Sequence, residues 1–98
     1  MPWLPDWQPP WRRLSRQQRR ENTGRLHEAN KALWANSDRE YAAGIRHETP
    51  EYHRLNDRVN DLWPQVPPWQ RSVIAQDIRE ARAQLRRRCA SRKSRSHR

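Results

Sequence analysis

Arginine side chains gathered at the two ends of the chain are the residues whose type and spacing point most directly to chemistry. A guanidinium is a planar fork of donors that fits a phosphate group, and a cluster of them suits a polyanion. The charge is divided accordingly: residues 1–37 carry seven bases and three acids, residues 38–80 six bases and eight acids, and residues 81–98 eight bases and no acid. We therefore expect nucleic-acid binding through phosphate contacts by Arg12, Arg13, Arg16, Arg19, Arg20, Arg86, Arg87, Arg88, Arg92, Lys93, Arg95 and Arg98. Because 19 of the 21 bases are arginine, a GC-rich genome is an alternative source of this richness.

Tryptophans dominate the first 13 residues. Trp3, Trp7 and Trp11 are interleaved with four prolines, which exclude a continuous helix and favour an extended, polyproline-like arm. The arm could fold back so that its indoles cap a core that is otherwise poor in aromatic side chains. Alternatively, it is exposed and docks into a partner's groove or stacks on bases, since an indole offers much contact area for little lost entropy.

A short sequence echo links the arm to the middle of the chain. Pro9-Pro10-Trp11 and Pro67-Pro68-Trp69 each precede an expected helix. Proline is at home in a first helical turn, so two short matches do not establish a repeat.

Other constellations that could carry catalysis or bind a metal are weak. The two glycines, Gly24 and Gly44, are too far apart for a phosphate-binding loop. His47 and His53 are six residues apart with a proline between them, whereas a zinc helix needs two histidines four apart. Cys89 is a lone thiol among arginines with no histidine or carboxylate spaced to act with it. We expect no enzymatic activity, no metal and no cofactor.

The elements that must position these residues are helices, and the clearest signals lie between residues 49 and 88. Thr49, Pro50 and Glu51 supply a capping hydroxyl, a helical φ and an anion at the positive end of the dipole. Apolar residues then recur at spacings of three and four until Pro64 stops the helix: Tyr52, Leu55, Val59, Leu62 and Trp63.

A second helix opens at Pro67 or Pro68. Its predicted inner face consists of Val73, Ile74, Ile78, Ala81 and Leu85. Two amphipathic helices joined by a short loop should lie antiparallel and bury these faces together. A helix-turn-helix reader of DNA is disfavoured, because the connection is rich in proline and Trp69, Val73 and Ile74 are expected to point inward.

The N-terminal half gives weaker signals. Ser15 is expected to cap a helix that runs to about Trp34, with a narrow apolar stripe of Leu26, Ala29, Leu33 and Trp34. Residues 36–40 should interrupt the helix. Ser37 and Glu40 should then form a capping box for a short helix over 38–47.

Length and composition limit the number of domains and the size of the core. Ninety-eight residues, of which 33% are hydrophobic, make one domain with a small core. We predict an all-α fold, a three- or four-helix bundle built on the C-terminal hairpin, with residues 1–13 as the Trp/Pro arm, 14–88 as the helical domain and 89–98 as a disordered basic tail. No apolar run could span a bilayer and no signal peptide is visible, so we expect a cytoplasmic protein without membrane contact.

Two functions follow as hypotheses. The first is a small accessory protein that binds nucleic acid at the level of the backbone. In an up-and-down bundle its two basic clusters could meet on one edge, and this depends on the short helix over 38–47, which sets the parity of the bundle. The second is a protein-binding adaptor or small homo-oligomer that uses the hairpin and the tryptophan arm as its interface.

Overall fold

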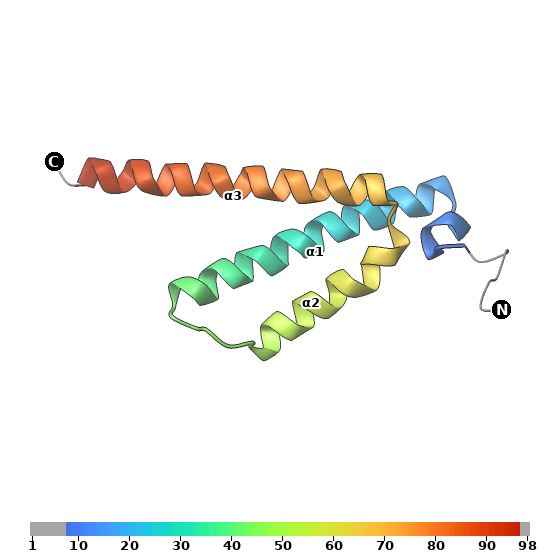
Figure 1. Ribbon diagram of the computed structural model, residues 1–98, viewed down its shortest axis with the longest axis horizontal. Coiled ribbons are helices and arrows are strands. Elements are labelled where there is room, and N and C mark those ends of the chain that lie inside the picture. The colour runs from blue at the N-terminus through green and yellow to red at the C-terminus, as the bar shows by residue number, and fades with distance from the viewer. Residues whose placement is uncertain (1–7, 97–98) are drawn as a thin grey trace, which may run out of the picture.

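The computed structural model describes residues 8–96, and the side chains of residues 8–91. Over this range every regular element is helical, which confirms the all-α prediction. Three α-helices, α1 (Arg16–Ala42), α2 (Pro50–Leu62) and α3 (Pro68–Ser96), are accompanied by two 3₁₀ helices, η1 (Pro10–Arg13) and η2 (Trp63–Gln65) (Figure 1).

Helix α1 is one continuous helix, so the predicted break at residues 36–40 and the predicted helix over 38–47 are wrong. A buried stripe at spacings of four and three extends up to the first residue of the expected break: Asn22, Leu26, Ala29, Leu33 and Asn36. Burial of this stripe outweighs the local preference of Ser37 for a cap. The helix ends where Gly44, with φ of +84°, donates to the Tyr41 carbonyl at 3.1 Å, because glycine tolerates this left-handed conformation.

Helix α2 begins as predicted. The Thr49 hydroxyl accepts from the Tyr52 amide at 3.1 Å, and Pro50 occupies the first helical position. Hydrogen bonds from the Arg54 guanidinium lower the pKa of the exposed Glu51 carboxyl in the same first turn. The predicted inner face is confirmed for the buried Leu55, Val59 and Leu62.

Five residues around the turn and on α3 that were expected to face the core are exposed instead: Trp63, Trp69, Val73, Ala81 and Leu85. The Trp63 side chain is 42% exposed, whereas the Val66 side chain is completely buried. Among the described side chains of α3, only Ile74 and Ile78 are buried, whereas Trp69, Val73 and Leu85 are each more than half exposed. The buried face of α3 is narrow because α3 packs mainly on α1 and not on α2. Leu85 lies towards the end of the contact between α1 and α3.

The arrangement places α1 at the centre. It packs most closely on α2, which runs antiparallel to it, and also packs on α3, which runs in the same direction as α1 (Figure 1). Thus α2 and α3 follow each other as a hairpin, but they do not mainly bury their faces against each other as predicted. One core joins all three helices and the turn: Leu26, Ala29, Leu33, Leu55, Val59, Leu62, Val66, Ile74 and Ile78.

Helix α3 continues well past the end of α1 (Figure 1). The sequence predicts a disordered tail from residue 89, but the helix reaches Ser96. Alanine, leucine, glutamine, arginine and lysine favour helices, and cations at the helix C-terminus interact well with its dipole. The molecule is consequently elongated, with principal extents of 67 × 27 × 24 Å.

Candidate nucleic-acid interface

Helix η1 brings the end of the arm against the turn that opens α3. Trp11 and Trp69 meet edge to face, with ring centroids 5.2 Å apart and planes at 83°. The two copies of the Pro-Pro-Trp echo therefore touch through their indoles. Arg12 lies over the Trp11 ring, 5.3 Å from its centroid, so the same contact holds a cation next to the indole pair.

The first turns of α1 supply the next three arginines. A capping box fixes their origin: Ser15 Oγ accepts from the Gln18 amide at 3.1 Å, and Gln18 Oε1 accepts from the Ser15 amide at 2.9 Å. No carboxylate occupies the first turn, so Arg16 and Arg19 stand beside the positive end of the helix dipole without an acid to neutralise them. An anion is the ligand that such an end favours.

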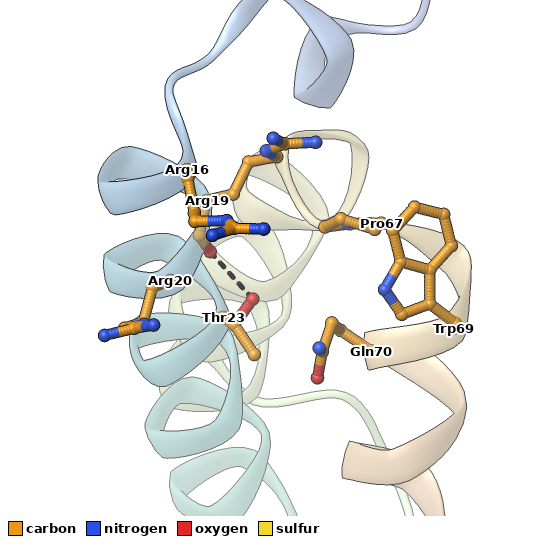
Figure 2. A pocket seen from close by; sticks show the side chains of 7 residues that line it. All are labelled: Arg16, Arg19, Arg20, Thr23, Pro67, Trp69 and Gln70. Carbon is orange, nitrogen blue, oxygen red and sulfur yellow. Dashed lines mark hydrogen bonds between the residues drawn. The ribbon is translucent and has the colours of Figure 1, made fainter.

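These arginines line a pocket of about 430 Å³ that α1 shares with the start of α3. Its lining consists of Arg16, Arg19, Arg20, Thr23, Pro67, Trp69 and Gln70. Figure 2 shows the arginines projecting from α1, with Pro67, Trp69 and Gln70 on the opposite side. The Thr23 hydroxyl is engaged, because it donates to the Arg19 carbonyl at 2.8 Å. The pocket thus combines guanidinium groups, a largely exposed indole and a primary amide.

We call this surface the arginine–tryptophan end, and it comprises Trp11, Arg12, Arg13, Arg16, Arg19, Arg20 and Trp69. None of its arginines has a carboxylate within 4.0 Å among the residues that the structure describes. The nearest acid along the chain, Glu21, accepts instead from Gln17 at 3.3 Å. The guanidinium groups of this end are therefore available to an external anion.

Sequence reasoning missed Trp69, Thr23 and Gln70 as members of this site. Trp69 was expected to point inward, yet it is 57% exposed. The echo contained the signal, because Pro68 opens α3 and places Trp69 in its first turn, as Pro10 places Trp11 in η1. A residue in a first turn beside a proline turn lies at the edge of a core instead of inside it.

The second basic cluster lies on the projecting part of α3. Arg86, Arg87 and Arg88 are exposed there. Arg92, Lys93 and Arg95 follow on the same helix, although their side chains are outside the described set, and Arg98 lies outside the described residues altogether. The neighbouring Cys89 is an exposed free thiol.

The two clusters do not converge. Because residues 16–42 form one helix, α1 and α3 run in the same direction, and the arginine–tryptophan end lies at the start of both. Arg87 is 18 residues further along α3 than Trp69, which corresponds to about 27 Å at about 1.5 Å per residue. Without the short helix over 38–47, the parity is the one that keeps the two clusters apart.

The other residues considered as site candidates contribute less to the candidate interface. Trp3 and Trp7 lie outside the described residues, so of the three partner-binding tryptophans only Trp11 has a described position. His53 Nε2 lies 3.2 Å from a Glu48 carboxylate oxygen, but within residues 8–96 no three metal-ligating side chains gather.

No protein-family model, curated protein or solved structure matches this chain. Within the described residues, no helix is both long enough and apolar enough to cross a bilayer. The chemistry of the two basic clusters is what distinguishes the surface of this molecule.

Proposed function

We propose that this protein is a non-enzymatic accessory factor that binds nucleic acid mainly through phosphate contacts. The observation that carries the proposal is the arginine–tryptophan end, where Arg16, Arg19 and Arg20 share one pocket with Trp69 at the start of α1. Its guanidinium groups lack acidic partners within residues 8–91 and lie at the helix end that attracts anions.

The chemistry of binding has two parts. Guanidinium forks pair with phosphate oxygens, and each neutralised phosphate releases counterions. The Trp69 indole, which is 57% exposed, offers a surface on which an unpaired base can stack. Arg86, Arg87 and Arg88 add a second set of phosphate contacts on α3.

A salt titration tests the proposal. We expect binding of a mixed-sequence duplex and of a single strand to weaken by roughly 10³ to 10⁵ between about 50 and 200 mM salt if 6 to 10 phosphates are contacted. Changing Arg16, Arg19 and Arg20 together to glutamine should weaken binding and lower the salt slope by about 3, one for each lost phosphate contact.

The matched control changes three exposed arginines of the middle of the chain, Arg25, Arg54 and Arg58, to glutamine. It removes the same charge but should leave the slope near that of the unaltered protein. Absence of binding at about 50 mM salt, or equal slopes for both triple variants, contradicts the proposal.

A second candidate is a protein-binding adaptor or homo-oligomer. It is favoured by exposed apolar side chains on α3, of which Val73 is 54% and Leu85 55% exposed. Under this alternative, changing Trp3, Trp7 and Trp11 together to alanine should abolish binding, while removal of residues 86–98 should not. Under the nucleic-acid proposal, removal of residues 86–98 should weaken binding strongly.

A further inference from the structure

The charge of the chain falls into three blocks once the fold is known. Residues 8–20 carry five bases and no acid, residues 21–85 nine bases and ten acids, and residues 86–98 seven bases and no acid. The first block belongs to the arginine–tryptophan end, and residues 86–96 of the third block belong to the projecting end of α3. The molecule is thus positive at both ends and slightly negative between them.

The electrostatic fields of the two basic ends do not overlap at physiological salt. Arg87 and Trp69 are separated by about 27 Å along α3, whereas the Debye length at physiological salt is about 8 Å. Each end therefore presents its own positive potential. A phosphate group held at one end does not feel the guanidinium groups of the other.

The middle of the molecule, residues 21–85, does not favour a nucleic-acid backbone along its whole length, because its acids slightly outnumber its bases. Three of its nine bases are paired with acids of the same chain: Lys31 with Glu28 at 3.6 Å, Arg54 with Glu51 at 2.6 Å, and Arg82 with Asp38 at 2.9 Å. By contrast, the exposed Asp57, Asp61 and Asp77 have no ion pair among the residues that the structure describes. Asp77 lies on α3 between the two basic ends, and a nucleic-acid backbone laid along this helix would meet its carboxylate, whereas Asp57 and Asp61 lie on α2.

We propose that a single copy of this protein bridges two separate segments of duplex nucleic acid, one held at each end. This inference rests on the proposed function and goes beyond it, since binding alone requires only one end. The straight α3 helix sets the separation of the segments, and the neutral to acidic middle keeps them apart.

A capture experiment tests bridging separately from binding. One duplex is tethered to beads, and the retention of a second, dye-labelled duplex of unrelated sequence is measured with the full chain at about 50 mM salt. Three variants are compared with the unaltered protein: Arg16, Arg19 and Arg20 to glutamine; Arg86, Arg87 and Arg88 to glutamine; and the control Arg25, Arg54 and Arg58 to glutamine. Retention of the protein on the first duplex is followed in parallel.

The expected result is that both end variants remain on the tethered duplex but capture at least about tenfold less of the second one, because each lost phosphate contact weakens the affected end. The control should capture as the unaltered protein does. An equal mixture of the two end variants should not restore capture, because each copy has only one working end.

Other outcomes are decisive in different ways. Binding of the tethered duplex without capture of the second overturns bridging and leaves the proposed function standing. Absence of any binding overturns both. Restored capture by the mixed variants would mean that associated copies, each holding one duplex, make the bridge, which overturns the single-copy proposal.

Discussion

Thr49 links the two halves of the chain through one hydroxyl. It accepts from the Tyr52 amide at the start of α2 and donates to the Glu40 carboxylate near the end of α1. We predict that Thr49→Ala lowers the free energy of unfolding by about 1 to 2 kcal/mol, because the helix loses its cap and the loop loses its tie to α1. Urea denaturation measures this. Thr49→Ser retains the hydroxyl and should stay close to the unaltered protein; equal losses for both variants would contradict the role of the hydroxyl.

Asn36 is a buried amide in the α1 stripe. It is 5% exposed, and its Nδ2 has no hydrogen-bond partner among the described residues. An unsatisfied buried donor costs about 1 to 3 kcal/mol, so we predict that Asn36→Leu raises the free energy of unfolding by about 1 kcal/mol. Thermal and urea unfolding check the sign.

Asn22 is the natural control for this substitution. It is equally buried in the same stripe, but its Nδ2 donates to Gln65 Oε1 at 3.3 Å and its Oδ1 accepts from Arg25 at 3.2 Å. Asn22→Leu should therefore destabilise the fold by leaving the Gln65 and Arg25 groups without this partner. If both leucine variants shift stability in the same direction, the satisfaction of the amide is not what separates the two positions.

At the scale of the elements, α1 and α3 are joined near the end of their contact by an ion pair beside an aromatic ring. The Arg82 guanidinium donates to both Asp38 carboxylate oxygens, at 2.9 and 3.3 Å, and lies 4.4 Å from the centre of the Trp34 ring. A double-mutant cycle with Asp38→Asn and Arg82→Gln should give a coupling of about 0.5 to 1 kcal/mol, because both side chains are partly in water. The coupling free energy should decrease in high salt. A value of zero at low salt would mean that the Asp38–Arg82 ion pair does not stabilise the interface between α1 and α3.

The last turns of α3 extend past the end of α1 (Figure 1). An isolated helix shorter than about 12 to 15 residues is marginal in water, so residues 86–96 should open easily while the turns around Ile74 and Ile78 stay closed. Hydrogen exchange should show fast amide exchange after residue 86 and protection at least about tenfold greater over 74–82. Uniform protection along α3 would mean that something covers the projecting half. Addition of duplex should slow exchange there if the phosphate contacts form as proposed.

How much of these elements the sequence predicts depends on whether the signal is local. The start of α2 was predictable because Thr49 and Pro50 act on their own turn, and its inner face because Leu55, Val59 and Leu62 repeat at helical spacing. The continuity of α1 was not, because Ser37 and Glu40 look like a cap, and only packing along the stripe from Asn22 to Asn36 overrides them. Local chemistry predicted a break that tertiary burial removes.

The candidate site shows the same division. Its arginines were predictable from composition and position, since a cation cluster without acids is visible in the sequence. Their neighbours were not, because the outward position of Trp69 depends on which helix covers α3. The separation of the two clusters also depended on a single non-local fact, the number of helices before α3, since that number decides whether α1 and α3 run in the same direction.

At the scale of the whole molecule, elongation is the property on which the separation of the basic ends depends. The Cα radius of gyration is 17.9 Å, whereas a compact chain of this length has about 13 Å. Small-angle scattering of the monomer should therefore give a value near 18 Å, and removal of residues 86–98 should reduce it markedly. A value near about 13 Å for the full chain would mean that α3 folds back over the bundle. The basic ends would then approach each other and form one continuous anion-binding surface, on which a single duplex would satisfy both clusters. A radius near 18 Å is therefore a requirement of the bridging proposal that can be checked before any nucleic acid is added.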